Sequence, residues 1–110
     1  MCGRYVIYDQ LTQGSLTLLG HEIPVHFNVA PTSHMPIIKS NPESREPELW
    51  IARWGLLPNW AKDLKIPPFF NARADKLPGN KVFWPSINQR CLAPLAEFYE
   101  FIQKIPLSSS

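Results

Sequence analysis

Proline is the residue type that most constrains how this chain folds, with twelve among 110 residues. Each Pro removes a backbone hydrogen-bond donor and fixes the φ dihedral, which opposes the long helices of a bundle. Four Trp and six Phe need burial and argue against a disordered chain. We therefore expect an α+β protein with much loop, forming one domain or part of one.

The charge balance limits the possible partners. Eleven Lys and Arg against nine Asp and Glu leave a net charge of +2, too low for a histone-like coat, so any DNA binding must use a local patch. No apolar run approaches the roughly 18 residues of a membrane span, and residues 1–5 lack the basic and apolar regions of a signal peptide. We expect a cytosolic protein without membrane contact, associated with the nucleoid if the source is bacterial.

Cysteine and histidine usage argues against a metal site. The two cysteines, Cys2 and Cys91, could pair, but free thiols are the default in a reducing cytosol. Together with His21, His26 and His34 they form no CxxC or HExxH spacing. We expect no metal and no cofactor.

Local patterns predict short elements separated by loops. Strands are expected over 4–8, 35–39, 48–57, 90–95 and 98–103, with 35–39 and 48–57 forming a hairpin around an exposed turn at 41–47. An amphipathic helix is expected over 11–19 and a turn of helix near 83–88. Ordered loops are expected over 27–32 and over 58–70, where large apolar groups in a Pro-rich loop suggest function.

Cys2 is the residue with the most distinctive chemistry. Removal of Met1 by a methionine aminopeptidase, which acts before small second residues, would leave an N-terminal 1,2-aminothiol. Its amine, with a reference pKa of about 7.7 to 8.0, and its thiol, at about 8.5, both supply reactive forms near neutral pH. Such a group condenses with an aldehyde to a Schiff base and then to a thiazolidine ring. The alternative is that Cys2 is merely a small second residue.

Further polar residues follow aromatic ones. Glu100 lies among aromatics in residues 98–101, where desolvation would raise its pKa and suit it to proton transfer, unless it lies on the polar face of an edge strand. Asn71 and Arg73 would share one side of an extended segment and suit a sugar oxygen and a phosphate; the alternative is an N-cap and a surface Arg. Trp60 could stack on a base or belong to the core.

Several short motifs are spread along residues 1–104. They are Met1-Cys2-Gly3-Arg4-Tyr5, Asn28-Val29-Ala30-Pro31-Thr32, Trp54-Gly55-Leu56-Leu57-Pro58, Trp60-Ala61-Lys62-Asp63, Asn71-Ala72-Arg73-Ala74, Arg90-Cys91-Leu92-Ala93-Pro94 and Phe98-Tyr99-Glu100-Phe101. In these residues and their order the sequence resembles the SOS-response-associated peptidase (SRAP) family, abasic-site sensors that attach covalently to single-stranded DNA.

The resemblance implies roles for individual residues. Cys2 would be the crosslinking nucleophile, Asn71 would position the ring-opened sugar, and Glu100 would transfer protons. The residues expected to border or contact single-stranded DNA are Arg4, Arg73, Pro31 and Trp60. The implied fold is the N-terminal part of a mixed α+β domain with curved, largely antiparallel sheets and short helices.

The resemblance has departures. Glu97 replaces a residue that is usually small in the family, and Phe101 stands where Trp is common. Family members are longer, and their second half supplies further strands and a catalytic His, so residues 1–110 are interpreted as one SRAP-like domain without its C-terminal half. Cys91 is expected to be a buried strand residue. The oligomeric state is left open.

Three functions remain as hypotheses. The first is covalent capture of abasic sites in single-stranded DNA through Cys2. The second is a non-catalytic remnant that retains single-strand DNA or partner binding. The third is an autoprocessing thiol peptidase. Whether the chain is an enzyme, hydrolase or lyase-like, therefore stays open at the level of sequence.

Overall fold

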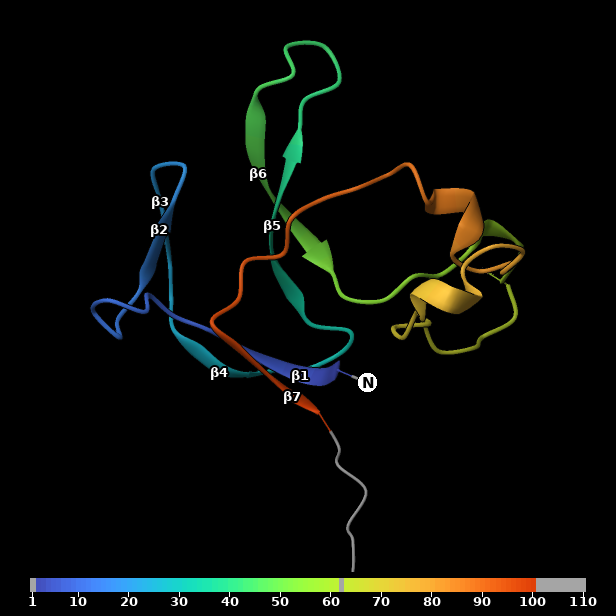
Figure 1. Ribbon diagram of the computed structural model, residues 1–110, viewed down its shortest axis with the longest axis horizontal. Coiled ribbons are helices and arrows are strands. Elements are labelled where there is room, and N and C mark those ends of the chain that lie inside the picture. The colour runs from blue at the N-terminus through green and yellow to red at the C-terminus, as the bar shows by residue number, and fades with distance from the viewer. Residues whose placement is uncertain (1, 62, 101–110) are drawn as a thin grey trace, which may run out of the picture.

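The computed structural model describes residues 2–61 and 63–100. Figure 1 shows small, separate β-sheets that are joined by long loops. The strands are β1 (Cys2–Ile7), β2 (Leu16–Leu18), β3 (His21–Ile23), β4 (His26–Val29), β5 (His34–Ser40), β6 (Pro47–Arg53) and β7 (Glu97–Glu100). Short 3₁₀ helices are η1 (Asn59–Ala61), η2 (Ala74–Lys76) and η3 (Trp84–Ser86).

The sheet that contains β1 carries most of the buried residues. Its order is β4-β1-β7, and both pairings of β1 are antiparallel. Tyr5, Val6 and Ile7 are consecutive in β1 and all buried, so β1 is covered on both faces as well as paired on both edges. Tyr5, Ile7, Ile23 and Val29 form the core cluster. The predicted strand at 4–8 is confirmed, with its start at Cys2.

The predicted hairpin is also confirmed, but its second strand, expected over 48–57, ends at Arg53. β5 and β6 pair antiparallel from His34 opposite Arg53 to Ser40 opposite Pro47. The turn between them is closed by Asn41, whose side-chain oxygen accepts the backbone N–H groups of Glu43 and Ser44 at 2.8 and 3.1 Å. Such a side chain mimics a backbone turn, which explains why this polar stretch reverses the chain.

The helix predicted over 11–19 is wrong, because this segment forms a turn and then β2 of the β2–β3 hairpin. The Asp9 carboxylate accepts the N–H groups of Leu11 and Thr12, at 2.8 and 3.1 Å, and so competes with helical hydrogen bonds. Leu19 and Gly20 then both take positive φ, 49° and 79°, as a two-residue hairpin turn requires. Leu16 and Leu18 are two residues apart, which is the side-chain repeat of a strand.

Other expectations need smaller corrections. Residues 26–29 form β4 instead of a loop, because Val29 pairs with Tyr5. The segment 90–95 is no strand; it contributes one bridge, Leu92 to Ile38. The helical turn near 83–88 is confirmed as η3. β7 confirms the start of the strand expected over 98–103, whose residues 101–103 lie outside the described part.

The fold class is antiparallel, as expected, but its α component is small. Within the described residues the helical elements are three-residue 3₁₀ turns, so that part of the α+β expectation lacks support. The physical reason is the density of Pro and of side-chain-capped turns, which interrupt helices before a second turn forms. In residues 2–61 and 63–100, no helix is long and apolar enough to cross a membrane.

Candidate active site at the junction of β1 and β7

The first strand brings two of the predicted residues to facing positions. In the antiparallel pairing of β1 with β7, Cys2 lies opposite Glu100, at the end of both strands. Nearly the whole described chain separates these residues in sequence. The backbone therefore joins the expected nucleophile and the expected proton-transfer residue at one end of the sheet.

A β-bulge sets this pairing. Val6, Tyr5 and Arg4 pair in step with Glu97, Phe98 and Tyr99, and the register then shifts between Arg4 and Cys2. Without the shift, Cys2 would lie opposite residue 101. A bulge places an extra residue in one strand and re-aims the chain, and Gly3 occupies the position between the two pairs. Ideal Cβ placement at Gly3 meets no atom within 4 Å.

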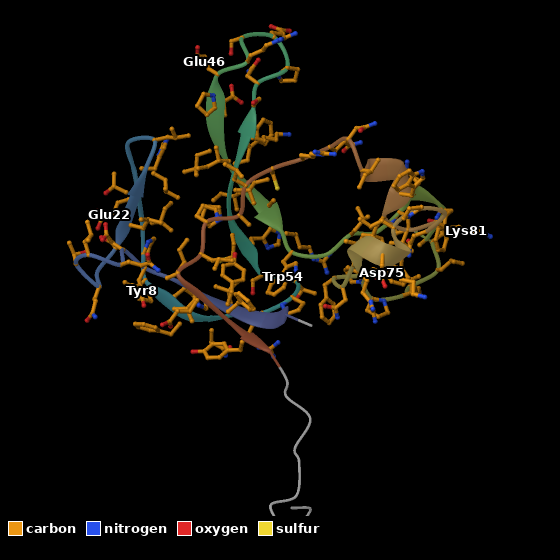
Figure 2. The ribbon with its side chains drawn as sticks, viewed as in Figure 1. Tyr8, Glu22, Glu46, Trp54, Asp75 and Lys81 are labelled. Carbon is orange, nitrogen blue, oxygen red and sulfur yellow. The ribbon has the colours of Figure 1, made fainter. Side chains whose placement is uncertain are left out.

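Trp54 connects three segments that carry predicted residues. Its ring lies 5.3 Å from the ring of Tyr5 in β1 and 6.4 Å, edge-on, from the ring of Phe70. Its backbone carbonyl accepts the N–H of Thr32 at 2.8 Å. Figure 2 labels Trp54 where β6 ends, on the side of the hairpin toward β1. Pro31 precedes Thr32 and Asn71 follows Phe70, so each of these predicted residues is next in sequence to a residue that Trp54 contacts.

The loop before Asn71 is attached by backbone hydrogen bonds. Leu56 and Phe69 exchange both N–H···O bonds, at 2.7 and 2.9 Å. Gly55, at φ 129°, allows the approach, since a Cβ there would lie 2.8 Å from Cβ of Pro68. Asn71 itself is half-buried. It is not the N-cap of η2, because Arg73 occupies that position, so this part of the alternative is wrong, whereas Arg73 is indeed a surface Arg.

The two predicted phosphate contacts are both exposed arginines. Arg4 donates through Nη1 to the Gly3 carbonyl at 2.7 Å. Arg73 forms a bidentate ion pair with Asp75, with both N···O distances 3.1 Å. An exposed pair of this kind contributes only about 0.2 to 1 kcal/mol, so a phosphate competes for Arg73 at small cost.

The predicted groove-lining residues differ in position. Trp60 is 55% exposed, so the alternative that it belongs to the core is wrong. Its indole N–H points to the Lys81 carbonyl at 3.4 Å, in the lobe that carries η2 and η3, where Figure 2 labels Lys81. Pro31 is half-buried in the turn after β4. Pro31 therefore lies next to a residue that bonds to Trp54, whereas Trp60 contacts the part of the chain that carries η2 and η3.

Glu97 has a partner although the family usually has a small residue there. Partial burial and the Glu97 carboxylate, which accepts the Tyr8 hydroxyl, raise the pKa of Tyr8 above its ordinary value of 10.0. The Tyr8 ring also lies 6.3 Å from the ring of Phe27. Tyr8, Phe27, Gln13 and Glu97 line one shallow hollow, which explains how the sheet accommodates a larger residue at 97.

Cys91 is a further correction. It is an exposed free cysteine, not a buried strand residue, because only its neighbour Leu92 bonds to β5. Within the described part of the chain, no group of three or more His, Cys, Asp and Glu has the arrangement of a metal site.

The structural importance of Trp54 and Gly55 is harder to predict from the sequence than that of Cys2, Asn71 or Glu100. Trp54 and Gly55 belong to one of the motifs quoted above, but the motif by itself does not say what they touch. Gly55 lies two residues after the end of β6, and a Gly beside a strand is a usual signal of a close backbone approach. The connection from Trp54 to β1 joins residues remote in sequence, and no local pattern encodes it.

Comparison with known proteins agrees with these motifs. The family model described as SOS response associated peptidase (SRAP) matches residues 1–108. Abasic site processing proteins YoaM and YoqW of Bacillus subtilis (strain 168) are each 36% identical to this chain over 92% of its length. Abasic site processing protein YMR114C of Saccharomyces cerevisiae is 28% identical over 68% of it.

The coverage is one-sided. The aligned region makes up 47% of YoaM and 48% of YoqW, so the chain spans about half the length of these curated relatives. No solved structure matches the chain. The family match nevertheless extends over nearly all of these residues, and the chain belongs to the SRAP family.

Proposed function

We propose that this protein captures abasic sites in single-stranded DNA through a covalent bond to Cys2. The observation that carries the proposal is the bulged register that sets Cys2 opposite Glu100. The names of YoaM and YoqW, which are abasic site processing proteins, support the substrate class. The Cys2 amine is free to react once Met1 has been removed.

The proposed reaction balances without an oxidant or a cofactor. The Cys2 amine adds to the aldehyde carbon of the ring-opened sugar, and loss of one water gives a Schiff base. The thiolate then adds to the same carbon, so that a C–S bond forms and the nitrogen takes up a proton. The product is a thiazolidine, and the sum is aldehyde plus aminothiol giving the ring plus water.

The neighbouring residues would assist these steps. Glu100, across the strand pair from Cys2, would protonate the departing hydroxyl and accept the thiol proton. Asn71 would hold the sugar oxygen by hydrogen bonds from its amide. Arg4 and Arg73 would contact phosphates, and Pro31 and Trp60 would border the strand, where an exposed indole suits base stacking.

Crosslinking to an oligonucleotide with one abasic site tests the proposal. Cys2→Ala should abolish the stable crosslink, because an Ala amine forms only a hydrolysable Schiff base. Glu100→Gln should slow formation by a factor of about 10² to 10⁴ without preventing it. Asn71→Ala should fall between them, through lost positioning. The yield is followed over time on a denaturing gel, and the unmutated chain is expected to react slowly.

A second candidate is a binding module without chemistry. The exposure of Trp60, Phe69 and Phe70 around one lobe favours it, since base stacking on aromatic rings needs no nucleophile. Binding of single strands by a chain that forms no crosslink would support this candidate. A Cys2→Ala protein that crosslinks as stably as its parent would instead remove Cys2 from the mechanism.

A further inference from the structure

A small hollow on the β4-β1-β7 sheet combines an acidic side chain with aromatic rings. Val6 in β1 lies opposite Glu97, and residues opposite each other in an antiparallel pair share one face of the sheet. Tyr8, two residues after Val6, continues along that face, whereas Tyr5 and Ile7 of the core cluster point to the other. The residues that line the hollow are Tyr8, Gln13, Phe27 and Glu97.

Backbone hydrogen bonds hold the walls of the hollow in place. In the turn between β1 and β2, the Asp9 N–H donates to the Gly14 carbonyl at 2.9 Å, and the Asp9 carbonyl accepts the Gln13 N–H at 2.7 Å. Just before β7, the Ala96 N–H donates to the Val6 carbonyl at 2.8 Å. The side chains of the hollow are therefore positioned by the sheet and its turn, which lowers the cost of ordering them around a ligand.

Two aromatic rings supply the apolar part of the hollow. The ring centroids of Tyr8 and Phe27 lie 6.3 Å apart, and the ring planes are tilted by 40°. Phe27 is 65% exposed, so a ligand can reach its ring. Aromatic rings attract cations within about 6 Å of the ring centroid, and two rings this close can act on the same cation. The aromatic pair thus favours a positively charged ligand.

Glu97 supplies a negative charge beside these rings. Its carboxylate accepts the Tyr8 hydroxyl and keeps further acceptor sites for a ligand, because an ionised carboxylate has about four lone-pair positions. Within residues 2–61 and 63–100, no ion pair neutralises this carboxylate. The cation of β1, Arg4, donates to the Gly3 carbonyl. The side-chain amide of Gln13 adds another acceptor at the rim of the hollow.

We propose that this hollow binds the guanidinium group of an arginine side chain in a partner polypeptide. A guanidinium is planar, stacks on aromatic rings and presents its N–H donors in a fork that matches a carboxylate. Phe27 supplies the ring and Glu97 the carboxylate. The volume of the hollow is about 260 Å³, below the roughly 300 Å³ at which pockets for drug-sized ligands begin. A single side-chain group therefore fits the hollow better than a nucleotide does.

Other ligands match these residues less well. A lysine ammonium is a strongly hydrated point charge that cannot stack on a ring. The Glu97 carboxylate repels the phosphates of DNA. Tyr8 is also six residues from Cys2 along β1, roughly 20 Å at about 3.3 Å per residue, so the hollow is separate from the site of the proposed reaction.

Titration with N-acetyl-argininamide, followed by ¹H–¹⁵N NMR spectra of the protein, tests the proposal without DNA. We expect saturable shifts of the backbone amides of Tyr8, Gln13, Phe27 and Glu97, with a Kd of about 1 to 10 mM for so small a ligand. N-acetyl-citrullinamide has nearly the same shape without the charge and should bind about tenfold more weakly. N-acetyl-lysinamide should bind about two- to fivefold more weakly, through loss of stacking.

Variants of the hollow sharpen the test. Glu97→Gln keeps the shape, removes the charge and should weaken binding about tenfold. Phe27→Leu should weaken it about two- to fivefold, because the ring is lost. Glu46→Gln is the matched control, since it removes the same charge from an exposed residue at the tip of the β5–β6 hairpin, which Figure 2 shows far from Tyr8. Its affinity should stay within about twofold of the parent. Because the replaced side chains are exposed, amide shifts outside the hollow should match the parent in each variant.

Three results would overturn the proposal. They are the lack of saturable shifts at these amides up to about 50 mM N-acetyl-argininamide, binding of the citrulline or lysine amide as tight as that of the arginine amide, and equal weakening by Glu97→Gln and Glu46→Gln. The titration does not measure crosslinking, so its failure leaves the proposed reaction of Cys2 untouched. Failure of the crosslinking test likewise leaves the guanidinium site standing.

Discussion

Gly55 offers the sharpest perturbation of the loop that carries Asn71. Its φ is 129°, a conformation that L residues rarely adopt, and a Cβ added there would lie 2.8 Å from Cβ of Pro68. Two penalties therefore act together in Gly55→Ala. One is the backbone strain, and the other is a clash with a ring that has no flexible end to move away.

The two penalties have different sizes and can be separated. A residue held in such a sparsely populated region costs about 1 to 3 kcal/mol. Forcing an extra carbon into a packed contact costs about 1 to 3 kcal/mol more. We expect Gly55→Ala to lower the free energy of unfolding by about 2 to 6 kcal/mol. For a domain of this size the lower end of that range shifts Tm by about 8 to 16 °C.

The assay is urea unfolding followed by tryptophan fluorescence, with two controls. Gly79→Ala isolates the strain, because Gly79 has φ 80° and no atom within 4 Å of an added Cβ; we expect a loss of about 1 to 2 kcal/mol. Adding Pro68→Gly to Gly55→Ala removes the clashing carbon and completes a double-mutant cycle. The cycle should show a coupling of about 1 to 2 kcal/mol.

A Gly55→Ala variant no less stable than Gly79→Ala, or a cycle without coupling, would show that the clash with Pro68 contributes nothing. A functional readout accompanies stability. Amide exchange of Phe69, which donates to Leu56 at 2.9 Å, should accelerate in Gly55→Ala and recover in the double variant. If Asn71 acts as proposed, the crosslinking rate should follow the same order.

The remaining predictions concern the N-terminus, DNA binding and Tyr8. Intact mass should show that Met1 is absent, and retention of Met1 in most molecules would contradict crosslinking through Cys2. Single-stranded DNA should bind more tightly than duplex DNA, and its affinity should fall with salt concentration as expected for a few phosphate contacts. Asp75→Asn should tighten binding, because it frees Arg73 from its ion pair. Equal, salt-independent binding of both DNA forms would reject the groove. Because the folded-state pKa of Tyr8 is raised, its contribution to stability is present below about pH 10 and lost as pH rises through the folded-state pKa. Glu97→Gln should lower that pKa in a tyrosinate absorbance titration, with Tyr8→Phe identifying the transition, and an unchanged titration would exclude the carboxylate as a cause.

Much of this protein follows from patterns between neighbouring residues. The strand at β1, the β5–β6 hairpin and the turn closed by Asn41 depend on alternation and on side chains that bond to their own turn, so a local reading predicts them. The motifs containing Cys2 and Glu100 identify the family in the same way. Local patterns predict well where nearby residues supply the deciding hydrogen bonds.

Local patterns do not decide the structure where two periods fit equally well. The leucines near residues 16–19 suit a helical stripe, but the Asp9 carboxylate and the Leu19-Gly20 turn favour a hairpin. Cys91 was expected in a strand, and a single bridge at Leu92 left it exposed. In both cases the local structure depends on which of the competing hydrogen bonds forms.

By itself the sequence determined which side chains are candidates for the proposed chemistry: the thiol of Cys2, the carboxylate of Glu100 and the amide of Asn71. Only the tertiary structure decided how they are arranged. The bulge that pairs Cys2 with Glu100, and the contact of Trp54 with the rings of Tyr5 and Phe70, join segments far apart along the chain. Strand register depends on the whole sheet, because shifting a pairing by one residue moves every side chain to the other face, and no short stretch of sequence contains that choice.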